Sequence, residues 1–167
     1  MHKNVITQLK DFLFDKYKVN WQNRMFSQKV GNELRTYKLV KEVFETEMYL
    51  SKNIPSRYRS AFAKFRCGVA PLRIETGRYE NKNVHERVCF ICHDQIEHVL
   101  LDCTLYADLR ERLFNEVKSS NVHFIISSDD DKFIYLFQST ECYDLVAKTC
   151  SNILRRRNIF FIFLMDS

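Results

Sequence analysis

Residues 89 to 103 read Cys-Phe-Ile-Cys-His-Asp-Gln-Ile-Glu-His-Val-Leu-Leu-Asp-Cys. Within this stretch Cys89, Cys92, His98 and Cys103 have the spacing C-x2-C-x5-H-x4-C. Three thiolates and one imidazole can surround a zinc ion tetrahedrally, and four protein ligands leave no position for water or substrate. The stretch therefore predicts one structural Zn²⁺ that organises the local fold, and it argues against a catalytic metal.

Other readings of these side chains stay open at this point. His93 is an alternative ligand, but it directly follows Cys92 and would have to bind with a strained geometry. The same residues could also be a buried histidine among unligated core thiols, or they could form disulfides. Three further cysteines lack a C-x2-C partner and are interpreted as small core residues: Cys67, Cys142 and Cys150.

Several classes of enzyme are excluded by the motifs. Zinc deaminases place their histidine in H-x-E ahead of P-C-x-x-C, whereas here His98 follows the cysteine pair and Glu97 precedes it. No P-loop, G-x-S-x-G or H-E-x-x-H pattern occurs. The acidic run Asp129–Asp131 is interpreted as the N-terminal cap of a helix, because carboxylates favour the positive end of the helix dipole; the alternative is a site for a divalent ion.

Composition favours a mainly helical intracellular domain. The chain has 167 residues, of which 46% are hydrophobic and only three are Gly and two Pro. Its first 20 residues lack the continuous apolar core of a secretory signal, so clustered cysteines indicate a metal in a reducing compartment, nuclear or cytoplasmic. The longest apolar run, Ile159–Met165, is far shorter than the about 20 residues needed to span a membrane.

Hydrophobic spacing predicts helices at Val5–Tyr17, Asn32–Leu50, Pro55–Arg66, Leu105–Lys118 and Asp131–Phe137, with a last helix beginning near Glu141. Ser127–Asp130 would cap the fifth of these. We expect an N-terminal helical segment at 1–50, a zinc module at 51–118 with its knuckle at 87–103, and C-terminal helices at 119–167 that pack on the module. The only β-structure expected is a short ribbon around Cys89 and Cys92.

Motifs on both sides of the cysteines resemble a known family. They are RIETGRY at 73–79, ERVCFIC at 86–92, the Glu97–His98 pair and CTLYADLR at 103–110, preceded by LRTYKLVKEVFETEMYL at 34–50. Together they resemble the zinc-binding segment that follows the polymerase in non-LTR retrotransposon reverse transcriptases, over about residues 20–160. The resemblance implies a helical zinc module that assists nucleic-acid handling, with Cys89, Cys92, His98 and Cys103 as ligands.

The chain departs from that family in two ways. The insert between the cysteine pair and the Glu97–His98 pair is short, so the loop should be tight. No polymerase palm or YxDD sequence is present, so the chain itself should not be an enzyme and would belong to a reverse transcriptase only as a fragment of a longer protein.

The basic residues suggest a partner. The formal net charge is +5, and eight lysines and arginines face three glutamates between Pro55 and Arg87. Tyr58, Tyr79 and Phe90 offer stacking surfaces beside them, as in single-strand binding proteins. The predicted phosphate contacts are Arg57, Arg59, Lys64, Arg66, Arg73, Arg78 and Arg87. The alternative is a solvated basic face over core aromatics.

A second basic group, Arg155–Arg157, is either another phosphate contact or a set of cations at the C-terminus of a helix. The expected function is therefore a non-enzymatic zinc module that binds RNA or DNA, with no small-molecule substrate and no membrane. The alternative is a protein-interaction module with a structural zinc. The apolar tail Ile159–Met165 either docks on the core or forms an exposed patch through which two copies associate.

Overall fold

The structure is a computed structural model that describes residues 2–26, 35–72, 76–77, 79–89, 92 and 98–165. Across these ranges the chain is helical and contains no β-strand, so the prediction of a mainly α fold is confirmed. The ribbon expected around Cys89 and Cys92 is not formed by the described residues there, although residues 90–91 and 93–97 lie outside the described part.

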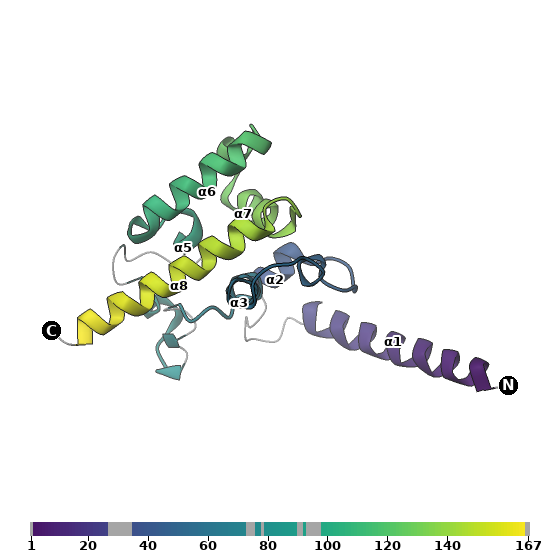
Figure 1. Cartoon of the computed structure of the whole chain (residues 1–167). Coiled ribbons are helices and arrows are strands. Elements are labelled where there is room, and N and C mark those ends of the chain that lie inside the picture. The colour runs from purple at the N-terminus through teal and green to yellow at the C-terminus, as the bar shows by residue number, and fades with distance from the viewer. Residues whose placement is uncertain are drawn as a thin grey trace.

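The long helices are α1 (His2–Phe26), α3 (Ser56–Arg66), α6 (Ala107–Ser120), α7 (Asp129–Gln138) and α8 (Tyr143–Met165). Short α-helices are α2 (Arg35–Val40) and α5 (His98–Leu101). Single 3-10 turns are η1 (Met48–Leu50), η2 (Val84–Glu86), η3 (Thr104–Tyr106) and η4 (Phe124–Ile126). Figure 1 shows α8 running through the body of the molecule, with α6 and α3 on different sides of it.

The core forms where α3, α7 and α8 meet. Phe62 of α3 is fully buried, and its ring centroid lies 4.9 Å from Tyr49, 5.0 Å from Phe137 and 5.3 Å from Tyr143. Burying aromatic rings against one another contributes more than their area alone. Because these four rings come from four separate elements, this contact fixes how the C-terminal helices lie on α3.

Hydrophobic spacing located most of the helices correctly. The predicted Pro55–Arg66, Leu105–Lys118, Asp131–Phe137 and C-terminal helices correspond to α3, α6, α7 and α8. Most side chains that this spacing places inward are buried: Phe62 and Phe65 on α3, Leu113 and Val117 on α6, and Val146, Cys150 and Ile153 on α8. Tyr58 on α3 and Leu109 on α6 are only half-buried. These side chains recur every three or four residues, so each helix turns one apolar face to the core.

Two helix predictions were wrong in extent. The helix expected to continue to Leu50 stops at Val40, and residues 41–47 form an irregular segment before η1. The helix expected at Val5–Tyr17 is longer, and Ile6, Leu9 and Leu13, whose helical spacing predicted it, are 55%, 56% and 41% exposed. Spacing alone indicates which side chains share a face, and it does not say whether another element covers that face.

Candidate metal centre

Three of the four predicted ligands lie together. The Sγ atom of Cys103 is 3.9 Å from that of Cys89 and 3.7 Å from that of Cys92, and all three sulfurs lie within 4.8 Å of one another. A tetrahedron of sulfurs at the usual Zn–S bond length of about 2.3 Å has edges of about 3.8 Å. The two separations from Cys103 therefore match edges of a zinc-sized tetrahedron, and the third lies within 4.8 Å.

A disulfide does not account for these distances. An S–S bond is about 2.05 Å long, well short of the separations above, and none of the six cysteines, all of which lie in the described ranges, forms a disulfide. The other three cysteines lie elsewhere: Cys67 is half-buried directly after α3, Cys142 is buried directly before α8, and Cys150 is buried within α8. Their interpretation as core residues is confirmed for Cys142 and Cys150.

The fourth ligand cannot be assigned from side-chain positions. His98 is the first residue of α5, five residues before Cys103, but its side chain lies outside the described part of the chain. The alternative ligand His93 falls in the range 93–97, also outside it.

Backbone contacts hold Cys103 against the helical body. The residue is fully buried and precedes η3, where its carbonyl oxygen accepts hydrogen bonds from Tyr106 N at 3.1 Å and from Arg110 Nη1 at 2.9 Å. Two residues further on, Leu105 O accepts from Arg156 Nη1 at 2.9 Å. Arginines of α6 and α8 thus fix the segment that carries the third sulfur to the core.

Close packing also holds the chain that leads to Cys89. Arg87 Nε donates to Lys82 O at 2.8 Å, and the Arg87 side chain lies against Gly77. A Cβ atom at Gly77 would come within 2.7 Å of Arg87 Cγ, so only glycine fits there without displacing that side chain. Gly77 therefore lets the arginine stem cross the backbone just before the cysteine pair.

The electrostatics of the three sulfurs favour a cation. Burial, together with the neighbouring Cys89 and Cys92, raises the pKa of the Cys103 thiol to about 12, although a hydrogen bond from the Leu105 backbone acts in the lowering direction. Without a metal the Cys103 thiol therefore stays protonated at neutral pH, whereas a bound divalent cation would displace the proton and offset the repulsion among three thiolates. The donor set of thiolates suits zinc better than magnesium or calcium, which prefer oxygen ligands.

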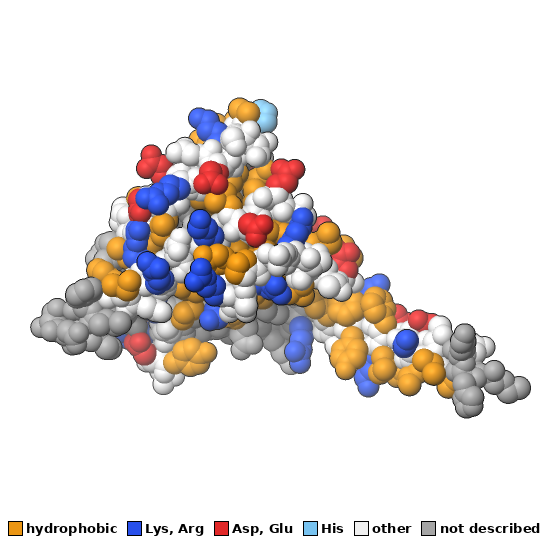
Figure 2. Space-filling view, viewed as in Figure 1, with side chains coloured by type: hydrophobic (Ala, Val, Ile, Leu, Met, Phe, Trp, Pro, Cys, Tyr) orange, Lys and Arg blue, Asp and Glu red, His pale blue; other side chains and the backbone are white. Residues whose placement is uncertain are grey.

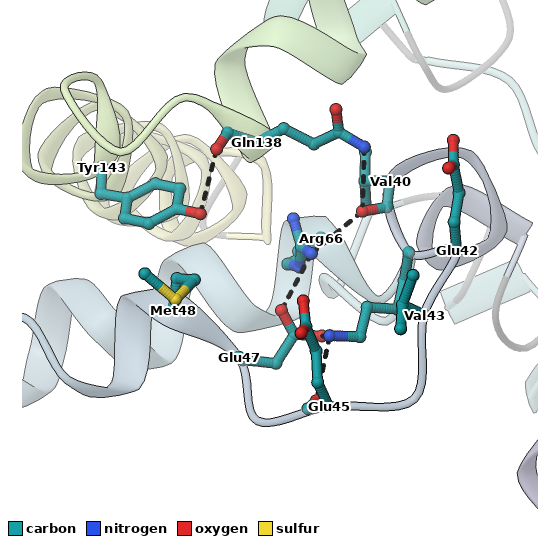
Figure 3. Close-up of a pocket in the computed structure, with 10 residues that line it drawn as sticks. Val40, Glu42, Val43, Glu45, Glu47, Met48, Arg66, Gln138 and Tyr143 are labelled. Carbon is teal, nitrogen blue, oxygen red and sulfur yellow. Dashed lines mark hydrogen bonds and ion pairs between the residues drawn. The ribbon is translucent and has the colours of Figure 1, made fainter. Parts of the chain in front are cut away.

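Burial removes one residue from the predicted nucleic-acid contacts. Arg66 is only 4% exposed, and its guanidinium donates to Phe137 O, to Val40 O at 3.1 Å and to the Glu47 carboxylate at 2.9 Å. Arg66 helps to line a cleft of about 220 Å³. Figure 3 shows its side chain between Glu47 below and Gln138 and Tyr143 above. The prediction that Arg66 contacts phosphate was wrong, because the side chain is committed to the interior.

The other predicted phosphate-binding residues differ in their exposure to solvent. Arg57 and Lys64 are exposed on α3, and the Arg57 guanidinium lies 4.6 Å from the centre of the Tyr58 ring. Arg59 is half-buried and donates to Ile54 O at 2.8 Å, and Arg87 is half-buried as described above. Arg73, Arg78 and the predicted stacking residue Phe90 lie outside the described residues. Tyr79 is 89% exposed.

The second basic group sits within a helix and not at its end. Because α8 continues to Met165, Arg155–Arg157 lie in its middle, and their interpretation as C-terminal cations was wrong. Arg156 forms a two-pronged ion pair with Asp108 of α6, whereas Arg155 is exposed. Arg155 and Arg156 line a groove of about 260 Å³ with Leu109, Asn152 and Ile159. Figure 2 shows lysines and arginines gathered on this face, over α6 and α8.

Comparisons with known proteins identify no relative: no protein-family model, no curated protein and no solved structure matches the chain. No helix in the described ranges is both long and apolar enough to cross a membrane.

Proposed function

We propose that the chain is a non-enzymatic module in which one zinc ion, bound by Cys89, Cys92, His98 and Cys103, holds the segment between η2 and η3 against α6 and α8. The observation that carries the proposal is the triangle of three sulfurs, in which those of Cys89 and Cys92 lie 3.9 and 3.7 Å from that of Cys103. The spacing of His98 relative to that triangle supports it as the fourth ligand, which closes the site and leaves no open position for catalysis.

The metal content of purified protein tests this assignment. Protein prepared without added zinc should contain one zinc per chain, and Cys89→Ser and Cys92→Ser should lose it. Cys67→Ser is the matched control, since Cys67 lies outside the sulfur triangle. His98→Ala should lose the metal and His93→Ala should retain it. Absence of zinc from the unmodified protein, with its helical signal intact, would contradict the metal assignment.

The second part of the proposal is that this module contacts the phosphates of RNA or DNA. Exposed cations on α3 (Arg57, Lys64) and α8 (Lys148, Arg155) support it, as do the residues that resemble the retrotransposon segment. The site formed by Zn²⁺, three thiolates and a neutral imidazole carries about one negative charge, so the surrounding arginines and lysines must attract the phosphates.

Binding of a labelled single-stranded oligonucleotide, measured by fluorescence anisotropy, tests the second part. Affinity should fall steeply between about 50 and 200 mM salt, because binding releases counterions from phosphates. Arg57→Glu with Lys64→Glu should weaken binding at least tenfold, and Arg155→Glu tests the contribution of α8 separately. An affinity that does not change with salt would contradict phosphate contact, and no binding at all would favour a protein-interaction role.

A further inference from the structure

Helix α1 carries a line of large apolar side chains that nothing in the described chain covers. Six of them are between 41% and 63% exposed: Val5, Ile6, Leu9, Phe12, Leu13 and Val19. We call this set the α1 stripe. Figure 2 shows hydrophobic side chains along the helix. Val5, Leu9, Phe12, Lys16 and Val19 alternate steps of four and three residues, which is the spacing of a two-helix seam.

A different side of α1 contacts the body. The Phe14 and Trp21 rings lie 5.3 Å and 5.7 Å from the Phe44 ring, and Met25 is 2% exposed. At about 100° per residue these side chains lie well away from the middle of the α1 stripe. Figure 1 shows the helix extending outward from the body toward its N-terminus, so the stripe is accessible to a second molecule.

The exposed area is too large for an isolated surface helix. Six side chains exposed to this degree present roughly 600 Å² of mostly apolar surface, the size of patch that marks an interaction site. Most helices in proteins depend on burial of an apolar face for their stability. If the α1 stripe stayed in water, α1 would lack the stabilisation that burial of an apolar face gives to most helices.

We propose that the α1 stripe pairs with the α1 stripe of a second copy of the chain, as an antiparallel two-helix coiled coil. Two stripes would bury about 1,200 Å² in total, which lies at the lower end of specific interfaces. The regular seam spacing favours a helix of the same kind as the occupant, and the protruding helix lets two bodies lie at opposite ends of the pair.

Lys16 determines the direction of the pairing. It is exposed and occupies a seam position between Phe12 and Val19. In a parallel pair the two Lys16 ammonium groups would meet in the same layer and repel each other. In an antiparallel pair centred near Phe12 they lie in different layers, and Val5 of each copy lies near Val19 of the other.

Sedimentation of the full 167-residue chain over about 1 to 100 µM tests the proposal, because an interface of this size should dissociate in the micromolar range. Leu9→Lys with Phe12→Lys should weaken dimerisation at least tenfold. Asn4→Lys with Gln22→Lys adds the same charge on a side of α1 away from the stripe and should have no effect. Lys16→Leu should tighten the dimer at least tenfold by removing the seam charge.

A charge pair tests the direction. The Val5→Lys, Val19→Glu double variant places opposite charges together only in the antiparallel pair, so it should dimerise more tightly than the Val5→Lys, Val19→Lys variant. Tighter dimerisation of the Val5→Lys, Val19→Lys variant would overturn the antiparallel arrangement. A chain that stays monomeric over the whole concentration range would overturn the pairing, even if its stripe binds anionic lipid vesicles instead. A dimer that persists in the Leu9→Lys, Phe12→Lys variant would also overturn it. Helical circular dichroism checks that each variant is folded.

Discussion

Among single residues, Arg66 illustrates how burial changes the role of a side chain. Its charge is balanced by Glu47, which also accepts a hydrogen bond from Tyr37 at 2.7 Å and lies 3.6 Å from Lys41 Nζ. Thr36 Oγ1 donates to the Arg66 carbonyl at 3.0 Å. A buried charge is tolerated only when it is paired and hydrogen-bonded in this way. Arg66 therefore links α2, α3 and α7 and does not face a ligand.

Replacing Arg66 with Met should destabilise the protein by about 3 kcal/mol, because the half-buried Glu47 carboxylate would lose its nearest cation and the carbonyl oxygens of Val40 and Phe137 would lose their donor. Urea unfolding followed by circular dichroism measures this change. The matched control is Arg57→Met, a surface arginine whose loss should cost under about 0.5 kcal/mol. Adding Glu47→Leu to Arg66→Met should recover part of the loss. Equal midpoints for the Arg66 and Arg57 variants would contradict a structural role for Arg66.

Asp108 provides a test by pH. A hydrogen bond from Arg156 lowers the pKa of Asp108 from 3.8 to about 2. The folded state therefore favours the charged carboxylate, so the contribution of the pair is complete above about pH 4 and is lost as the pH falls through 2. Because the pair is exposed, Asp108→Asn should cost only about 0.5 to 1 kcal/mol at pH 6.

The difference between Asp108→Asn and the unmodified protein should narrow as urea unfolding is repeated from pH 4 down to pH 2. Asp144→Asn, which removes an exposed carboxylate near the start of α8, is the control. A difference that stays constant over this range would show that the effect of Asp108→Asn does not come from its ion pair.

At the scale of elements, α7 shows what local sequence can determine. Ser128 is its N-cap, and Ser128 Oγ accepts a hydrogen bond from Asp131 N at 3.2 Å. Three aspartates occupy the first turn, where the helix dipole favours negative charge. The cap predicted at Ser127–Asp130 is confirmed, and among the described residues Asp129–Asp131 do not gather as a cation-binding group.

Ser128→Ala should destabilise the protein by about 1 kcal/mol, because it leaves backbone N–H groups of the first turn without an acceptor. Thermal unfolding gives the change in midpoint. Ser60→Ala serves as the control, since Ser60 is an exposed residue inside α3, where Ala is the better helix former. A loss no larger than that of the control would show that the cap contributes little.

Helix α2 shows the limit of local patterns. Apolar spacing predicts continuation beyond Val40, yet Val40 O accepts from Arg66 Nη2 and from Gln138 Nε2, which lies 98 residues away in the sequence. Lys41 Nζ then donates to Glu45 O at 3.0 Å within the irregular segment. These partners replace the hydrogen bonds of a continued helix and bring Glu47 to Arg66.

At the scale of the whole molecule, the four-ring contact around Phe62 connects the two halves of the chain. Phe62→Ala should cost about 3 to 5 kcal/mol, since it removes a fully buried ring and leaves a cavity among Tyr49, Phe137 and Tyr143. Phe62→Leu should cost clearly less, because it fills more of that cavity. Unfolding in urea distinguishes them, and similar losses would show that the ring contacts matter more than the cavity volume.

Metal removal should have a local effect. Cys103 belongs to the buried core and Cys89 and Cys92 pack against it, whereas the contact between α3 and α8 is made by other residues of that core. A chelator should therefore lower the unfolding midpoint by about 5 °C or more while most helical signal remains at about 25 °C. Complete loss of helix on chelation would show that the metal organises the entire domain.

The sequence alone determined the class of the fold, the places of α3, α6, α7 and α8, the cap of α7 and the cysteines that come together at Cys103. The helices and the cap depend on residue spacing over a few positions. The cysteine cluster depends on the C-x2-C spacing, which is typical of metal ligands. The zinc ion, His98 and the nucleic-acid contacts stay predictions.

Only the tertiary structure decided which faces are covered. It buried Arg66, ended α2 at Val40, paired Arg156 with Asp108 and left the α1 stripe in water. Each outcome depends on a partner distant in the sequence, or on the lack of cover for the stripe within the described chain. Local patterns contain no information about such partners, because the free energy of burial depends on what packs against a side chain and not on its neighbours along the chain.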